Sequence, residues 1–287
     1  MAQIITAKSA GFCFGVRRAV DMVYEEAEKG GPIYTYGPII HNEEVVADLE
    51  SRGVKVISSE DGIDKIHDGT IVIRSHGVSR EIDEKIRATG AKCIDATCPF
   101  VKRIHRIVEE NSAAGRQIVI IGNPSHPEVK GIMGWSSSPV IVIENAEQVK
   151  NCLESLSQGQ NREICVVSQT TFNINKFEEI IALLNETDYN VICMNTICSA
   201  TNERQTEAKA IAKVADVMIV IGGRSSSNSA KLYEICRREC ANTQFIQTWR
   251  DLNLSPAGKE QIIGITAGAS TPKNIIEEVQ NHVRADF

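Results

Sequence analysis

The sequence repeats one short unit three times: an apolar run of strand length, then a cysteine, then the start of a helical pattern. The three cysteines are Cys13, Cys98 and Cys198, and similar lengths of chain separate them. The second and third copies match further, because Cys93 and Cys193 each stand five residues before the later cysteine. A repeated supersecondary unit indicates a repeated packing unit. The sequence therefore predicts three similar lobes that pack as one compact body.

Short β-branched runs alternate with helical stretches along the whole chain, which is typical of α/β proteins with parallel sheets. Several runs are apolar nearly throughout, as strands covered on both faces tend to be. The expected strands are Gln3–Ala7, Ile71–Ser75, Gln117–Ile121, Val140–Glu144, Ile164–Ser168, Val191–Met194, Val217–Ile221 and Gln261–Thr266. The expected helices are Val16–Lys29, Pro99–Ala114, Asn202–Val214, Ala230–Glu239 and Pro272–Val283. The expected lobes are 1–97, 98–197 and 198–287.

Composition excludes several classes of protein. The chain has 287 residues and a net charge of −6, and no apolar run is long enough to span a membrane. An acidic balance argues against nucleic-acid binding, which needs a basic face. The N-terminal segment lacks the pattern of a secretion signal, so we expect a cytoplasmic protein. Its nine cysteines are then reduced, and each is either a core residue or a metal ligand.

The three repeated cysteines suit metal binding, because each would stand at a helix start, where the pKa of a thiol is lowered. Pro99 fits the first helical position, so we expect Cys98 at the helix cap. Three thiolates would hold three irons of a cubane cluster and leave the fourth open to a substrate. The alternative is three buried structural cysteines. Zinc-ribbon CxxC pairs and ferredoxin-type runs are absent. The cysteines expected in core or helix packing are Cys152, Cys165, Cys236 and Cys240.

Polar loops follow several expected strands, and ligands of open α/β sheets bind beyond the carboxyl ends of strands. His41, His76 and His126 each follow an apolar run and precede a turn-forming stretch. The run 225–229 is rich in serine and precedes a helix, where hydroxyl and backbone N–H groups can hold phosphate oxygens. A serine-rich helix cap is the alternative. No Walker A or GxGxxG pattern occurs, so a nucleotide cofactor is not supported.

Glu128 stands two residues after His126, on a loop at a strand end, where it suits proton delivery. A solvated loop acid is the alternative. The HxE pattern also occurs in zinc deaminases, but the PCxxC that those enzymes need is absent here.

Together and in order, these motifs resemble those of the 4-hydroxy-3-methylbut-2-enyl diphosphate reductase family of the non-mevalonate isoprenoid pathway. The similarity covers essentially the whole chain, from Gly11 to Thr271. One departure is Asn195, which stands where the second copy of the repeat has Asp95. The matching segments are GFCFGV at 11–16, His41-Asn42, SHG at 75–77, DATCP at 95–99, HPEV at 126–129, QTT at 169–171, ICSAT at 197–201, SSNS at 226–229 and GAST at 268–271.

The resemblance implies a trefoil of three parallel-sheet α/β lobes with pseudo-threefold symmetry around one central [4Fe–4S] cluster. Cys13, Cys98 and Cys198 would be the three protein ligands of this cluster, and its open iron would take the substrate hydroxyl. Glu128 would deliver protons, with Thr170 near the hydroxyl. The residues implied in diphosphate binding are His41, His76, His126, Ser226, Ser227, Asn228 and Ser270.

The same resemblance implies the last step of the pathway, reductive dehydroxylation of the hydroxy-allyl diphosphate to isopentenyl and dimethylallyl diphosphate. Ferredoxin or flavodoxin would supply two electrons, one at a time. We expect no nucleic-acid or membrane partner, and we expect the chain to act as a monomer. Two other interpretations are a quinolinate-synthase-like dehydratase, which needs no external electrons, and an iron–sulfur redox sensor.

Overall fold

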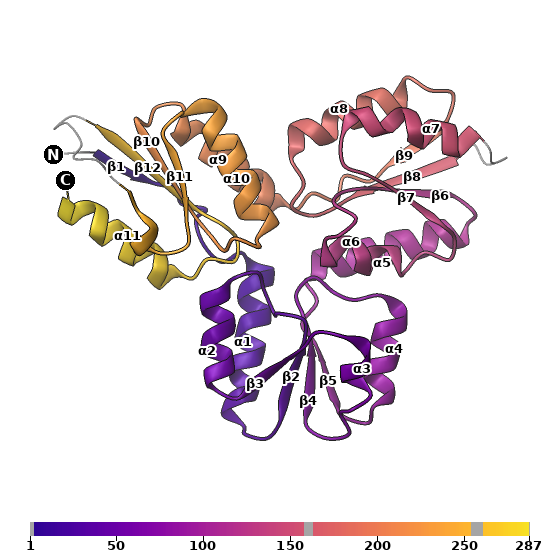
Figure 1. Cartoon of the computed structure of the whole chain (residues 1–287). Helices are drawn as coiled ribbons and strands as arrows, with labels where there is room; N and C mark the ends of the chain where they lie inside the picture. Colours follow the sequence, from indigo (N-terminus) through magenta and orange to yellow (C-terminus); the bar gives the residue numbers. More distant parts are fainter. Residues whose placement is uncertain (1–2, 158–162, 254–260, 287) are drawn as a thin grey trace. The chain divides into compact units, whose positions relative to one another are not determined.

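The computed structural model describes residues 3–157, 163–253 and 261–286, and these residues form three four-stranded sheets (Figure 1). Every strand pairing in the three sheets is parallel, and most connections between paired strands contain a helix. The predicted fold of three parallel-sheet α/β lobes is therefore confirmed. The chain divides into two compact units, one made of Met1–Arg17, Ile40–Leu49 and Ser199–Phe287, the other of Arg18–Ile39 and Glu50–Cys198.

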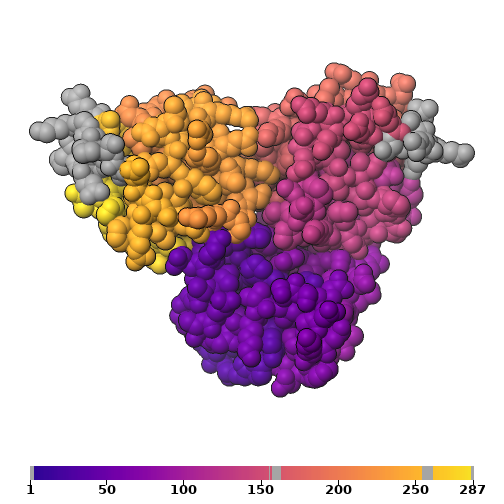
Figure 2. Space-filling view, viewed as in Figure 1, coloured from indigo at the N-terminus to yellow at the C-terminus, as the bar shows by residue number. Residues whose placement is uncertain are grey.

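The first unit contains one sheet, in the order β1-β12-β10-β11. Its central strand β10 is buried at every residue, because helices cover both faces of such a sheet. The C-terminal part of the chain, orange to yellow in Figure 2, forms much of the visible surface of this unit. Its elements are β1 (Gln3–Thr6), α9 (Ser199–Ala212), β10 (Val217–Ile221), α10 (Ser227–Glu239), β11 (Thr243–Ile246), η2 (Trp249–Asp251), β12 (Ile262–Ala267) and α11 (Lys273–Asp286).

The placement of β1 differs from the expected lobe boundaries. Lobe 1 was expected to hold residues 1–97 together, but β1 pairs with β12, from Gln3 beside Ile262 to Thr6 beside Ile265. The strand is apolar enough to pair with any parallel neighbour, so its partner depends on tertiary packing. The boundary between the units also falls inside two helices, α1 (Phe14–Glu28) and α2 (Glu43–Ser51).

The second unit contains two sheets, in the orders β3-β2-β4-β5 and β7-β6-β8-β9. Fully buried isoleucines on β4 and β6 lie in the two hydrophobic cores. The burial of each side chain contributes roughly 1.5–3 kcal/mol to the free energy of folding. The elements of the first sheet are β2 (Ile33–Tyr36), β3 (Val54–Ile57), α3 (Glu60–Ile63), β4 (Thr70–Ile73), α4 (Arg80–Ala88) and β5 (Lys92–Asp95). Those of the second are α5 (Pro99–Ala113), β6 (Gln117–Ile121), α6 (Pro127–Met133), β7 (Val140–Ile143), η1 (Ala146–Gln148), α7 (Val149–Ser157), β8 (Glu163–Ser168), α8 (Ile174–Asn185) and β9 (Asn190–Cys193).

Across the parts of the chain that the structure describes, no helix combines the length and the apolar character that a membrane crossing requires.

Candidate functional site

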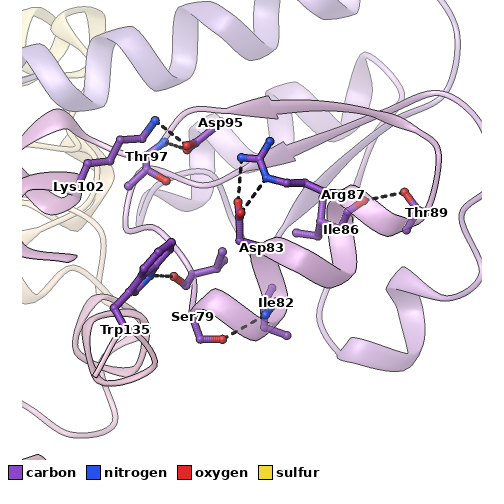
Figure 3. Close-up of polar contacts among 11 residues, drawn as sticks. Ser79, Ile82, Asp83, Ile86, Arg87, Thr89, Asp95, Thr97, Lys102 and Trp135 are labelled. Atoms are coloured by element: carbon purple, nitrogen blue, oxygen red, sulfur yellow. Dashed lines mark hydrogen bonds and ion pairs between the residues drawn. The ribbon is translucent and has the colours of Figure 1, made fainter. Parts of the chain in front are cut away.

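Cys98 lies in a tightly held turn between β5 and α5. Asp95, the last residue of β5, accepts a hydrogen bond from the backbone N–H of Thr97 at 2.9 Å (Figure 3). The Cys98 N–H donates to the carbonyl of Ser75 at 2.9 Å, so the loop after β4 supports the loop after β5. Burial alone would raise the pKa of Asp95, but hydrogen bonds from Lys102 and Thr97 lower it. Cys98 is the N-cap of α5, as predicted, and its thiol is half-buried.

The loop of Cys198 uses the same turn in the neighbouring sheet. Asn195 accepts a hydrogen bond from the backbone N–H of Ile197 at 3.1 Å, just as Asp95 does from Thr97. The N–H of Cys198 donates to the carbonyl of Thr170 at 3.2 Å. Asx side chains of either kind can make this bond to the residue two positions on. The change from Asp to Asn therefore removes a charge but keeps the turn.

The loop of Cys13, in the first unit, is held by two charged residues of α9. The buried Arg204 donates to the carbonyl of Gly11 at 2.8 Å, and Glu207 accepts from the N–H groups of Lys8 and Ser9, both at 2.8 Å. The Cys13 N–H donates to the carbonyl of Ala269 at 3.3 Å. No sequence motif pointed to Arg204 or Glu207, because the loop and the helix are far apart along the chain.

The nine cysteines differ in their environment. Cys13, Cys98 and Cys198 are half-buried where loops meet helices, whereas Cys93 on β5 is half-buried within a strand and Cys193 on β9 is exposed. In contrast, burial raises the pKa of Cys152 and Cys165 to about 11 each, because an apolar core disfavours the thiolate. Cys236 and Cys240 are buried too, against α9 and the sheet of the first unit, and burial raises the pKa of Cys236 to about 12. The core and packing roles predicted for Cys152, Cys165, Cys236 and Cys240 are confirmed.

Glu128 is a buried carboxylate and not a solvated loop acid. It is 3% exposed, and it accepts hydrogen bonds from the backbone N–H of Thr170 at 2.6 Å and from its hydroxyl at 2.7 Å. Because the carbonyl of Thr170 also binds the Cys198 N–H, one residue links the carboxylate to the cysteine loop. A buried acid that is held in this way can exchange a proton with a bound molecule.

Two of the predicted histidines meet within the second unit. His126 caps α6, and its Nδ1 accepts a hydrogen bond from the N–H of Glu128 at 3.1 Å. The rings of His76 and His126 lie edge to face, with 5.4 Å between their centroids. The bond to Nδ1 sets the tautomer of His126, so its Nε2 carries the proton and can donate to an anion.

The serine-rich loop and His41 come together in the first unit. Ser226 caps α10, Ser270 donates to the carbonyl of His41 at 2.9 Å, and the hydroxyl oxygens of Ser270 and Ser226 lie 3.4 Å apart. Ser227 begins α10, and Asn228 follows it. Asn228 is 6% exposed, yet its Nδ2 has no hydrogen-bond partner among the described residues. A buried amide donor without a partner costs free energy, so this loop fits an anionic ligand that would accept the bond.

His105 supports two of these loops. It lies on α5, is 6% exposed and stacks on Trp135 with 5.1 Å between ring centroids. Gly77 has a φ of +71°, and a Cβ there would lie 2.7 Å from the imidazole Cε1 of His105 and 3.0 Å from Thr97. The imidazole therefore fills the space between the loop of His76 and the loop of Cys98.

The environment of His105 predicts a pH-dependent stability. Desolvation lowers its pKa from 6.5 to about 4, so the unfolded chain binds a proton that the folded chain excludes. Stability should therefore fall as the pH drops from 6.5 towards 4, by about 2 kcal/mol between pH 7 and pH 5. Urea unfolding at both pH values, for wild type and His105→Gln, measures this difference. The variant should lack this part of the pH dependence, and equal losses in both proteins would contradict the assignment.

The amino-acid sequence matches the family model described as LytB protein over residues 4–284. The chain is 43% identical to the 4-hydroxy-3-methylbut-2-enyl diphosphate reductase of Caldanaerobacter subterraneus subsp. tengcongensis, over 99% of this chain and 97% of that protein. It is also 43% identical to the reductase of the same name from Clostridioides difficile, over 95% of this chain and 96% of that protein.

Solved structures agree with these relatives. An (E)-4-hydroxy-3-methyl-but-2-enyl diphosphate reductase, described as the terminal enzyme of the non-mevalonate pathway, matches with a TM-score of 0.71 and 38% identity, covering 99% of this chain and 100% of that one. The E-1-hydroxy-2-methyl-but-2-enyl-4-diphosphate reductase of Plasmodium falciparum matches with a TM-score of 0.89 and 29% identity, covering 99% of this chain and 87% of that one. Because the family model matches residues 4–284, which is almost the whole chain, this chain belongs to the LytB protein family.

Proposed function

We propose that this chain is the reductase for which its relatives are named, acting on (E)-4-hydroxy-3-methylbut-2-enyl diphosphate through one [4Fe–4S] cluster. The observation that carries the proposal is the chain of contacts from Glu128 through Thr170 to Cys198, which joins a buried acid to a cysteine loop. A dehydratase that takes no electrons lacks support, because the two relatives compared above are named as reductases. A redox sensor would not need a buried acid beside the cysteine.

Cys13, Cys98 and Cys198 would hold the cluster. Each stands on a loop fixed by backbone hydrogen bonds, whereas Cys93 and Cys193 lie on strands and the other four cysteines are buried. When bound, such a cluster supplies electrons one at a time and an open iron that can take the substrate hydroxyl. The protein contributes the fixed loops, which keep the ligands in place while the charge of the site changes.

The substrate diphosphate would be held by hydroxyl, imidazole and amide donors. Asn228 Nδ2 offers a buried N–H that needs an acceptor, and Ser226 and Ser270 lie beside it in the same loop cluster. His126 presents Nε2–H because its Nδ1 is used by the helix cap. The full set proposed for the diphosphate is His41, His76, His126, Ser226, Ser227, Asn228 and Ser270.

Glu128 would supply protons to the reaction, with Thr170 beside the substrate hydroxyl. The C–O bond at C4 breaks, the hydroxyl leaves as water after taking one proton, and a second proton adds to the allylic carbon chain. Two electrons balance this step, and the products are isopentenyl and dimethylallyl diphosphate. Hydroxide is a poor leaving group, so protonation by a nearby acid lowers the barrier.

The electrons would come from an external carrier protein such as ferredoxin or flavodoxin. We propose that the enzyme is a monomer. We also propose that it works in a reducing compartment such as the cytoplasm, because its nine cysteines, all among the described residues, are free thiols.

The function is tested by anaerobic purification, iron and sulfide analysis, and a turnover assay with reduced methyl viologen and the hydroxy-allyl diphosphate. We expect about four irons per chain, oxidation of two viologen radicals per substrate, and both isoprenoid diphosphates as products. Protein that holds a full cluster but does not oxidise the dye in the presence of this substrate would overturn the proposal.

Loss of the buried Asn228 amide should weaken substrate binding. We expect Asn228→Ala to raise KM by about 10-fold or more with a smaller effect on kcat, since a hydrogen bond to a charged group contributes roughly 1.5–3 kcal/mol. Asn173→Ala is the matched control, because that amide is equally buried but caps α8 by accepting from the Lys176 N–H. It should lower stability by about 1 kcal/mol and leave KM unchanged. An unchanged KM for Asn228→Ala would contradict its role.

A further inference from the structure

Large apolar side chains are rarely exposed in this protein, and the exceptions are not randomly placed. Among the described residues, three are exposed: Phe14 at 66%, Phe100 at 43% and Val214 at 56%. Phe14 directly follows Cys13, and Phe100 comes two residues after Cys98. An exposed aromatic side chain often marks an interaction surface, and here two of the three lie beside proposed cluster ligands.

The exposed face of α5 combines this aromatic residue with positive charge. Arg103 and Arg106 are exposed, follow Phe100 within two turns, and have no ion-pair partner in the part of the chain that the structure describes. We call Phe100, Arg103 and Arg106 the α5 basic face. The acidic residues of the helix, Glu109 and Glu110, come only later, so its positive charge gathers at the end that begins at Cys98. The helix dipole adds to this charge at the same end.

The helix after Cys13 has the same pattern. Arg17 is exposed three residues after Phe14, as Arg103 is three residues after Phe100, and it too lacks an ion-pair partner among the described residues. Residues three apart share one face of a helix. Two helices that begin at proposed cluster ligands thus each present a Phe–Arg pair to solvent.

A recess borders the α5 basic face within the second unit. A cavity of about 410 Å³ is lined by Pro99, Arg106 and Trp135, among others. Three carboxylates also line it, and each is paired with a cation: Asp83 with Arg87, Asp95 with Lys102 and Glu109 with Arg80. Figure 3 shows that the Lys102 ammonium points to Asp95 and is neutralised there, which leaves Arg106 as the unpaired cation of this wall. The recess can receive an apolar side chain of a partner next to the exposed cations.

We propose that the α5 basic face is the docking surface for an acidic one-electron carrier protein. The proposal rests on the proposed function, which requires two such electron deliveries per turnover. In each, the reduced carrier loses one electron to the cluster and departs oxidised. A local positive face on a chain of net charge −6 would steer an acidic carrier to the loop of Cys98 and away from the rest of the surface.

The test compares two electron donors on the same holoenzyme. Reduced methyl viologen is small and needs no docking surface, whereas reduced ferredoxin is an acidic protein. We expect Arg103→Ser/Arg106→Ser to raise KM for ferredoxin by about 10-fold or more at low ionic strength and to leave the viologen rate unchanged. Added salt should raise KM for ferredoxin in the wild type and have little effect in the variant. Phe100→Ser should raise this KM at every salt concentration.

Lys213→Ser/Val214→Ser is the matched control, because it removes one exposed cation and the third exposed apolar side chain, at the far end of α9 from Cys198. Its ferredoxin KM should equal that of the wild type.

The proposal is overturned if the double arginine variant keeps a normal ferredoxin KM, or if both donors lose rate equally. It is also overturned if light scattering shows a wild-type dimer that the variant disrupts, since the face then joins two copies. A wild type inactive with viologen would instead refute the proposed function.

Discussion

A Cys98→Ser variant is expected to lose the iron–sulfur absorbance and all detectable reductase activity while it remains folded. Serine keeps the size of the side chain and the backbone hydrogen bond of residue 98 to Ser75, so the turn after β5 should survive. A hydroxyl is a far poorer iron ligand than a thiolate, so the cluster would lose one of its three anchors. Anaerobic iron and sulfide analysis, visible spectra and the viologen assay measure the result. Cys13→Ser and Cys198→Ser should behave alike.

Two other cysteines provide matched controls for this experiment. Cys93 and Cys193 stand five residues before Cys98 and Cys198 on β5 and β9, and burial raises the pKa of each thiol. Cys93→Ser and Cys193→Ser should therefore keep four irons and near-normal activity. If Cys98→Ser retains its full iron content, or if the controls lose theirs, the proposed ligand set is wrong.

Glu128→Gln is expected to lower kcat by about 10²–10⁴-fold with the cluster intact, the loss typical of removing a general acid. Glutamine has the same shape and can still accept one hydrogen bond from Thr170, but it has no proton to deliver. KM for the substrate should change little, because Glu128 contacts the proposed donor His126 through its backbone N–H, which the substitution keeps. Steady-state kinetics with reduced viologen, together with iron analysis, separate lost chemistry from a lost cluster.

Glu26→Gln tests whether any buried glutamate would have the same effect. Glu26 is 6% exposed, and its hydrogen bonds with Lys92 and Lys29 lower its pKa to about 2. Its replacement should reduce stability, because it removes the negative charge that two ammonium groups share, and should leave kcat unchanged. A kcat for Glu128→Gln within 10-fold of the wild type would exclude Glu128 as the source of protons in a rate-limiting step.

Buried apolar strands were predictable from sequence, and short amphipathic ones were not. The runs that became β4, β6, β8, β10 and β12 are apolar nearly throughout, so periodicity and length identified them. The strands that were not predicted, β2, β3, β5 and β11, have four residues each and mix polar with apolar side chains, as Lys55 in β3 illustrates. In these strands the pairing with a neighbour supplies the stability, and a single sequence does not contain that information.

The helix start at Cys98 was also predictable, because Pro99 is a local feature that suits the first helical position. Helix α4 was missed, although Ser79 caps it and Ile82 and Ile86 are buried beneath it. More than half of its residues are charged, and the two isoleucines are too few to mark a helical period. Burial against the sheet, and not local propensity, selects the helix there.

Residue type and local order are enough to indicate which side chains can ligate a metal, donate a hydrogen bond or transfer a proton, and that these side chains follow strands. Tertiary contacts are needed to pair β1 with β12, to bind Glu128 to Thr170, and to place Arg204 and His105 against the cysteine loops. Those contacts join residues far apart along the chain. Their free energy arises from burial and hydrogen bonding that exist only once the chain has folded.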